Sequence, residues 1–294
     1  MQSAPSPLLR AAPWLFIVIW SSGYVVAKVA APHADPLTFL SVRYAGVIVV
    51  MGGLALVARA PWPRTPRQYL HLAVAGIAIQ AGYLGGVWVA IAHGMPAGLV
   101  ALIVNLQPGL TGAVGILTGE RVTGRQWLGL ALGFAGVMLV VSSKLGGAGG
   151  ATWAGTGLAI AALISITSGT LYQKRFCPNF DLRTGQVIQF TASLIVTLPF
   201  AVATERMHLD WTPGLLGVLA WAVIVLTGGG ISLLFLMIRH GAATKVTSYF
   251  YLVPPVTSVM AWLMFGEQLR GTALFGMAMT LLGVALVVRS PQPR

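Results

Sequence analysis

Residues 118–137 read TGERVTGRQWLGLALGFAGV, and residues 265–284 read FGEQLRGTALFGMAMTLLGV. The Gly-Glu pair and three more glycines of the first stretch return in the second, 147 positions later, in a chain of 294 residues. The pair His93-Gly94 returns at the same spacing, and Ser22-Gly23 returns at a spacing of 146. The sequence therefore predicts two copies of one unit, residues 1–147 and 148–294.

The composition indicates a membrane protein. Apolar residues make up 56% of the chain and charged residues 8%, and the mean hydropathy is +0.83. A soluble domain carries roughly a quarter charged residues, because its surface faces water. The net charge of +12 would suggest nucleic acid in a soluble protein. Here we assign it to loops held on the cytoplasmic side, and we expect no nucleic-acid partner.

The reactive side chains indicate neither a metal site nor a cofactor. Cys177 is the single cysteine, which excludes an intrachain disulfide and a cysteine-based metal cluster. The five histidines show no ligand spacing. We therefore expect no metal and no cofactor.

Proline, glycine and charge clusters divide the chain into apolar segments, several of them about 20 residues long, enough for a helix to cross a hydrocarbon core of roughly 30 Å. We place ten spans near 9–31, 36–57, 70–92, 96–118, 124–143, 154–174, 185–204, 214–238, 242–265 and 271–289. The predicted fold class is therefore an all-α polytopic membrane protein with ten transmembrane helices.

Five spans per copy is an odd number, so the second copy enters the membrane from the side opposite to the first. The two halves then form inverted five-helix repeats, an arrangement that is common in secondary carriers with one site near the midplane. With the N-terminus inside, thirteen basic residues lie on the inner side and four on the outer side. This asymmetry places both termini in the cytoplasm.

The N-terminal apolar segment resembles a signal peptide. We expect it to be retained, because no clear small-x-small cleavage site follows it and because it has a counterpart in the second copy.

Several motifs resemble one known family. Each fourth span carries a proline and ends in Gly-Glu, namely Pro108 with Gly119-Glu120 and Pro255 with Gly266-Glu267. Glycine-rich fifth spans (LGLALGFAGVMLVV and FGMAMTLLGVALVV), WSSGYVVAK at 20–28 and PLTFLSVRYAG at 36–46 complete the pattern. Over essentially its whole length the chain resembles EamA-type carriers of the drug/metabolite transporter superfamily.

The resemblance implies a bacterial exporter in the cell inner membrane that moves amino acids and other metabolites. Within the family, the chain is most similar to YddG-type aromatic amino-acid exporters.

Polar and aromatic residues inside the spans are the candidates for substrate contact. Polar side chains are costly in lipid, so most should face other helices or a wet cavity. Hydrogen bonding between helices, or back to the same helix, explains more than half of them. The mid-span amides of Gln80 and Asn105 are the preferred exceptions, because as a pair they can donate to and accept from a zwitterion without carrying a full charge. The predicted substrate-binding residues are Trp20, Tyr24, Gln80, Tyr83, Asn105, Ser168, Thr227 and Tyr249.

All six acidic residues fall at predicted helix ends or in loops. A buried carboxylate is the usual proton relay of a pump, so the pattern favours a facilitator, an exchanger or coupling by another route. Glu120 and Glu267 are expected to cap the helix that follows each of them, with a role in gating as the alternative. Arg43 lies inside a span, where it could meet a substrate carboxylate or form an outer gate. We favour a structural role, in which its side chain snorkels to the interface or pairs with helix-end carbonyls.

Pro108 and Pro255 should kink their helices near the middle. Glycine clusters at 82–86 and 228–230 occupy comparable places in the two copies, and we expect them to allow close helix packing and bending of these spans. We interpret Pro108 and Pro255 as hinges for alternating access, with static kinks as the alternative.

The predicted function is a secondary transporter that exports small metabolites, most of all aromatic amino acids, by alternating access and without ATP. Export of other amphipathic metabolites or drugs is the first alternative. A membrane-embedded transferase is disfavoured because the acids are scattered and show no DxxD pattern, and a sensor because no polar segment is long enough to fold alone. The expected partners are a small-molecule substrate and membrane lipids. The oligomeric state is left open, with a monomer among the options.

Overall fold

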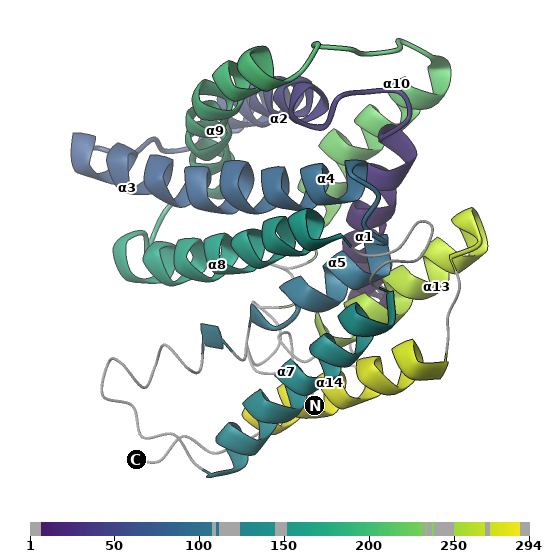
Figure 1. Cartoon of the computed structure of the whole chain (residues 1–294). Coiled ribbons are helices and arrows are strands. Elements are labelled where there is room, and N and C mark those ends of the chain that lie inside the picture. The colour runs from purple at the N-terminus through teal and green to yellow at the C-terminus, as the bar shows by residue number, and fades with distance from the viewer. Residues whose placement is uncertain are drawn as a thin grey trace. The chain divides into compact units, whose positions relative to one another are not determined.

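The computed structural model describes residues 7–107, 110–111, 124–144, 152–230, 233, 237, 250–267 and 271–288. These residues are almost entirely helical (Figure 1). Within them, the one pairing of extended segments is an isolated antiparallel bridge between Ala34 and Leu209. The prediction of an all-α protein is confirmed.

The helices follow the predicted spans closely. The first copy contains α1 (Pro7–Ala30), α2 (Pro36–Val57), α3 (Pro66–Gly76), η1 (Ile77–Leu84), α4 (Gly85–Ala92), α5 (Ala97–Val104) and α7 (Gly124–Lys144). The second contains α8 (Trp153–Phe176), α9 (Leu182–Thr204), α10 (Pro213–Ala220), η2 (Trp221–Gly230), η3 (Phe250–Leu252), α13 (Val253–Phe265) and α14 (Gly271–Val288).

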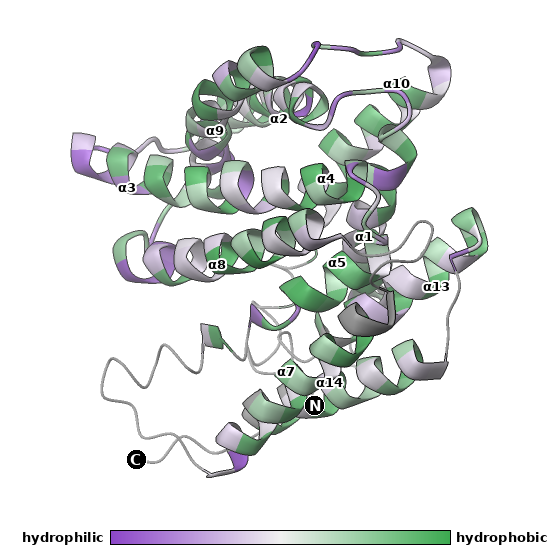
Figure 2. Ribbon diagram, viewed as in Figure 1, coloured by the Kyte–Doolittle hydropathy of each residue, from purple (hydrophilic) through white to green (hydrophobic). Residues whose placement is uncertain are grey.

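Six helices of the described residues are long and apolar enough to cross a membrane. They are Ala11–Ala30, Pro36–Val57, Pro66–Ala92, Trp153–Phe176, Leu182–Thr204 and Pro213–Gly230. Three shorter apolar helices cover Trp127–Val140, Val253–Phe265 and Gly271–Gly283. Figure 2 shows hydrophobic residues along these helices and hydrophilic residues at ends such as the start of α3. The chain is therefore a multi-pass membrane protein. Parts of the predicted fourth, eighth and ninth spans lie outside the described residues.

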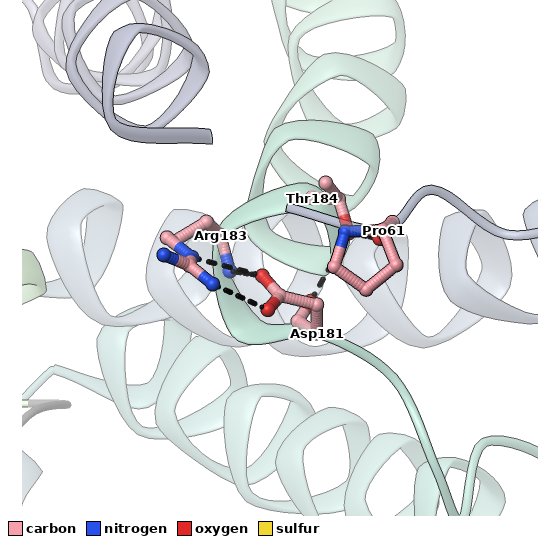
Figure 3. Close-up of polar contacts among 4 residues, drawn as sticks. All are labelled: Pro61, Asp181, Arg183 and Thr184. Carbon is pink, nitrogen blue, oxygen red and sulfur yellow. Dashed lines mark hydrogen bonds and ion pairs between the residues drawn. The ribbon is translucent and has the colours of Figure 1, made fainter. Parts of the chain in front are cut away.

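Prolines and hydroxyl or carboxylate caps begin several helices. Pro36, Pro66 and Pro213 occupy the first turns of α2, α3 and α10, where a missing N–H costs nothing because the helix leaves that donor unpaired. At α9, the carboxylate of Asp181 accepts from the Arg183 backbone N–H at 2.9 Å and pairs with the Arg183 guanidinium at 2.8 Å (Figure 3).

Contacts divide the chain into two compact units. Unit 1 comprises Met1–Val25, Pro96–Gly150 and Val225–Arg294, and unit 2 comprises Val26–Met95 and Ala151–Ile224. Each unit draws on both copies of the sequence repeat. The compact units are thus a different division from the predicted repeats 1–147 and 148–294, and the repeats remain a prediction about the sequence.

In unit 1, α7 and α14 pack closely through glycines (Figure 1). A Cβ added at Gly136 would lie 2.5 Å from the Gly276 carbonyl oxygen, and one added at Gly283 would collide with the backbone of Gly129 and Gly133. Residue numbers rise along one helix as they fall along the other, so the two helices are antiparallel. Only residues without side chains allow this approach.

In unit 2, the segment formed by α3, η1 and α4 packs against α8 and α9, and α2 packs against α9. Small residues again mark the closest approaches. A Cβ at Gly76 would lie 2.5 Å from Cα of Gln189 on α9, and a Cβ at Gly86 would lie 3.0 Å from Cβ of Ala162 on α8. Figure 1 shows α8 running along α3 and α4.

Both η1 and η2 are π-helical. They interrupt the third and eighth predicted spans, which are counterparts in the two copies. π-Helical turns are rare and occur often at functional sites. The glycines that we expected to bend these spans lie in or beside the two stretches.

Candidate functional site

The π-helical stretch η1 carries two of the predicted substrate-binding residues, Gln80 and Tyr83. Both side chains are buried in unit 2, and that of Gln80 is 9% exposed. The Gln80 carbonyl oxygen accepts a hydrogen bond of 2.7 Å from the hydroxyl of Tyr44 on α2. This bond ties the middle of α2 to the irregular part of the third span.

Arg43 lies in the same region, one residue before Tyr44. Its side chain is 6% exposed, and Tyr44 and Tyr83 lie close enough to interact electrostatically with the guanidinium. An arginine at the centre of a membrane helix costs about 2.5–3.5 kcal/mol on insertion scales, so burial among polar groups matters. Of the two structural roles expected for Arg43, snorkelling to the lipid interface is wrong, because the side chain is buried in the protein. Pairing with helix-end carbonyls stays a prediction.

Aromatic packing holds this polar cluster of Arg43, Tyr44, Gln80 and Tyr83. Tyr44 is fully buried, and its ring meets Phe190 of α9 edge-on, with centroids 5.3 Å apart. Among the described residues, the side-chain amide of Gln80 makes no hydrogen bond. The cluster thus combines a buried cation, the phenol of Tyr83 and the side-chain amide of Gln80, which is a suitable set for a carboxylate, while the phenol of Tyr44 is engaged by the Gln80 carbonyl.

Other predicted site residues lie in unit 1. Trp20 packs in an aromatic cluster with Phe16 and Phe250, at centroid distances of 5.2 and 5.3 Å. Tyr24 and Thr227 are buried. Asn105 is buried at the C-terminal end of α5, where its amide nitrogen donates to the Ala101 carbonyl at 3.0 Å.

The expected pairing of Gln80 with Asn105 joins residues of different units, and each unit is described by itself. The pairing therefore remains a prediction. Within unit 1, the Asn105 amide nitrogen donates to a carbonyl of its own helix. Such bonding was the structural alternative to substrate contact for polar residues in the spans.

The remaining predicted substrate-binding and hinge residues lie in different parts of the chain. Ser168 is exposed on α8 and donates to the Ser165 carbonyl at 3.1 Å. Pro255 is the third residue of α13, which begins directly after the 3₁₀ turn η3. The expected kink near the middle of its helix is therefore wrong, because a proline in the first turn interrupts no backbone hydrogen bond. Tyr249 and Pro108 lie outside the described residues.

The acidic residues in the described part of the chain lie at helix ends or in loops, as predicted. The Glu205 carboxylate accepts from the backbone N–H groups of Leu37 and Thr38, each at 2.8 Å, and so caps α2 from the end of α9. Asp35, which directly precedes α2, instead accepts from the backbone N–H groups of Arg206 and His208. Glu120 lies outside the described residues.

Glu267 makes a contact that was not predicted. Its carboxylate accepts a hydrogen bond of 3.3 Å from the backbone N–H of Ala97, the first residue of α5. Residues 268–270, which precede α14, lie outside the described residues, so capping of the following helix by Glu267 stays a prediction. Sequence adjacency suggested α14, whereas packing within unit 1 brings the end of α13 to the start of α5.

The described residues contain no group of three or more His, Cys, Asp or Glu side chains that could hold a metal ion.

A family model described as "EamA-like transporter family" matches residues 11–142 and matches again at residues 153–289. The chain belongs to the EamA-like transporter family. The two matches fall one in each predicted copy. The members of this family are transporters, and this EamA protein is accordingly a transporter and not an enzyme.

Several relatives extend the comparison. The chain is 27% identical over 283 residues to "Uncharacterized inner membrane transporter YedA" of Escherichia coli strain K12, covering 96% of this chain and 90% of that one. It is 27% identical over 285 residues to "Probable amino-acid metabolite efflux pump" of the same strain, covering 93% and 92%. A solved crystal structure matches with a TM-score of 0.64 at 18% identity, over 95% of each chain. That structural match indicates the fold alone.

Proposed function

We propose that this EamA transporter exports amino-acid metabolites as a secondary carrier in the bacterial inner membrane, with aromatic amino acids preferred. The observation that carries the proposal is the buried cluster of Arg43, Gln80 and Tyr83 inside a membrane-spanning unit. Relatives named as amino-acid metabolite efflux pumps support the same substrate class.

In this proposal Arg43 binds the substrate carboxylate. A guanidinium presents two parallel N–H donors to a carboxylate, and charge-assisted bonds of this kind are about twice as strong as neutral ones. The phenol of Tyr83 and the amide of Gln80 supply further donors. Asn105, Trp20, Tyr24, Thr227, Ser168 and Tyr249 remain proposed substrate contacts.

Alternating access between two inverted five-helix repeats is the proposed mechanism. Three features support it: the family model matches each copy, the π-helices η1 and η2 fall in counterpart spans, and α7 packs antiparallel to α14. In that packing Gly136 meets Gly276, and Gly129 meets Gly283, the counterparts of Gly129 and Gly136 respectively. Such an exchange of partners is what a two-fold relation produces.

We further propose that both termini lie in the cytoplasm and that no buried acid couples transport to protons. The thirteen-to-four distribution of basic residues supports the first point. The placement of the described acidic residues at helix ends and in loops supports the second. Proline hinges at Pro108 and Pro255 remain part of the proposal.

Uptake by the purified protein in liposomes tests this function. We expect labelled tryptophan to enter faster than labelled alanine or choline, with no dependence on a pH gradient. Arg43→Gln should raise the tryptophan concentration for half-maximal uptake at least about tenfold, because a hydrogen-bonded charge pair is lost. Lys174→Gln, which removes an exposed cation of unit 2, is the matched control. Uptake that requires the gradient, or an Arg43→Gln variant with unchanged uptake, would contradict the proposal.

A further inference from the structure

Unit 2 contains a cavity of about 580 Å³ that the predicted substrate contacts do not explain. Helices α2, α3, α4, α8 and α9 and the π-helix η1 contribute to its wall. The lining residues are Leu37, Val74, Ile77, Ala78, Ala81, Gly82, Gly85, Ser165, Val196, Thr197 and Phe200. Its volume lies within the range of pockets that hold small organic ligands.

The lining is almost entirely aliphatic and aromatic. Its two hydroxyl groups belong to Ser165, which donates to the Ala78 carbonyl at 2.9 Å, and to Thr197, which is 3% exposed and has no hydrogen-bond partner. Ser193, one turn earlier on α9, donates to the carbonyl four residues before it at 2.7 Å. The Thr197 hydroxyl can do the same by rotation, so the cavity does not require a polar ligand.

The cavity forms where α8 and α9 stand apart. The two helices are joined by a hydrogen bond of 3.2 Å from the side-chain amide nitrogen of Gln189 to the side-chain oxygen of Gln173. Ser165 lies eight residues before Gln173 on α8, and Thr197 lies eight residues after Gln189 on α9. Each is therefore about 12 Å from that hydrogen bond along its helix, at 1.5 Å per residue. The segment from Val74 to Gly85 lies between them and contributes six of the lining residues.

The dimensions and the rim of the cavity fit hydrocarbon. Val74 and Gly85 are eleven residues apart, about 16 Å along a helix, which is about half of a 30 Å hydrocarbon core and so the depth of one leaflet. The rim residues Val74 and Phe200 are 37% and 61% exposed. The Pro66–Ala92 span and α9 contribute nine of the eleven lining residues, and both are candidate membrane spans.

We propose that this cavity binds one acyl chain of a membrane phospholipid. The chain enters at the end marked by Phe200 and Leu37, because these residues lie near the end of α9 and the start of α2. Arg206 lies two residues beyond the end of α9 and is exposed, while the neighbouring Glu205 carboxylate is engaged by α2. Arg206 therefore offers a positive charge for the lipid phosphate at headgroup level. The bound chain braces η1 between α8 and α9.

Photo-crosslinking in liposomes tests the proposal without reference to transport. The probe is phosphatidylglycerol with a diazirine midway along one acyl chain. We expect labelled peptides that contain residues 74–85 and 196–200. Ala78→Leu with Ala81→Leu fills the cavity and should lower the labelling of the 196–200 peptide about tenfold. Ala220→Leu, a single substitution of the same kind at an exposed position of α10, should leave it unchanged.

Thr197→Val separates a lipid from a polar metabolite. An acyl chain has no use for the hydroxyl, so labelling should persist or rise in this variant. Loss of labelling in Thr197→Val, or its suppression by a soluble amino-acid derivative, would show instead that the cavity takes a polar metabolite and would overturn the proposal.

Native mass spectrometry of the wild-type protein gives a second measurement that needs no cavity-filling variant. One retained phosphatidylglycerol is expected, and Arg206→Gln should lower its occupancy. The absence of any retained phospholipid from the wild-type protein would contradict the proposal.

Discussion

Glu205 stabilises a helix to which it does not belong. Its two carboxylate oxygens accept from the Leu37 and Thr38 backbone N–H groups and from the Thr38 hydroxyl, each at 2.8 Å. The first N–H groups of a helix have no partners within the helix, and a carboxylate there also suits the helix dipole. Glu205 therefore joins the end of α9 to the start of α2.

We predict that Glu205→Ala lowers the free energy of unfolding by about 1–2 kcal/mol, because two partly buried donors lose a charged acceptor. Thermal unfolding in detergent measures this change. Thr204→Ala, which removes an exposed hydroxyl bonded to its own helix, is the control. Equal melting temperatures for the two variants would contradict the role of Glu205.

Asp181 gives a prediction about pH. The side-chain hydrogen bond from Arg183 is the largest cause that holds the Asp181 pKa below its ordinary value. A carboxyl with a lowered pKa stabilises the folded state above its ordinary pKa, near 4, and loses that contribution as the pH falls through the lowered value.

Asp181→Asn should keep the helix cap but lose the charge, since both residues cap well. We expect the wild-type protein to unfold at a higher temperature than the variant at pH 7, and this difference should shrink as the pH falls below 4. A difference that is constant from pH 7 to pH 3 would contradict the assignment.

At the scale of single residues, the sequence predicts whether a polar side chain is buried better than it predicts which groups that side chain contacts. Gln80 was expected to face the protein because an amide is costly in lipid, and it does so. The same argument could not assign Arg43, since a long side chain near a span end can either snorkel or turn inward. Glu267 shows a related limit, because its helix partner is distant in the sequence.

At the scale of helices, glycines decide how closely α7 and α14 approach. A Cβ at Gly136 would lie 2.7 Å from the Thr280 backbone nitrogen, and backbone atoms in a packed helix pair cannot give way cheaply. Gly124, at the start of the same helix, has nothing within 4 Å of the added Cβ. The two positions therefore form a matched pair.

We predict that Gly136→Ala destabilises unit 1 by about 1–3 kcal/mol, the usual cost of overpacking. Gly124→Ala should have little effect or a small stabilising one, since alanine favours helix. Thermal unfolding of the two variants in detergent compares them directly. If Gly136→Ala melts at or above the temperature of Gly124→Ala, the close approach of α7 and α14 is wrong.

The hydrophobic periodicity of the sequence does not predict the π-helical form of η1 and η2. Glycine clusters in the third and eighth spans predicted bending at comparable places, and both stretches are indeed irregular. Their π-helical form depends on packing against neighbouring helices, such as that of Gly82 against Ser165 and of Gly169 against Ile79, which a single sequence does not reveal. The cavity beside η1 arises from the same packing and was not predicted.

At the scale of the whole molecule, the sequence predicts the class of protein but not which helices pack together. The all-helical membrane class could be read from composition and the spacing of apolar segments, because it depends on hydrophobic length, and the recurrence at 147 agrees with the two matches of the family model. The compact units could not, since each combines segments of both copies. Sequence order alone does not say which spans pack together.

An odd number of spans per copy has a topological consequence. We predict that reporters fused to the N-terminus and to the C-terminus are both cytoplasmic, whereas a reporter inserted after residue 147 is on the opposite side. Alkaline phosphatase and fluorescent-protein fusions distinguish the two sides. Termini on opposite sides would exclude inverted five-helix halves.

The central claim is that this EamA protein carries an amino-acid metabolite by alternating access, with the cluster at Arg43, Gln80 and Tyr83 in contact with the substrate. Counterflow in liposomes tests it most directly: vesicles loaded with unlabelled tryptophan take up labelled tryptophan from outside. We predict that internal tryptophan accelerates uptake by the wild-type protein. The Gln80→Ala variant should fold but lose this acceleration. Uptake that is indifferent to internal tryptophan, or equal in the two proteins, would contradict it.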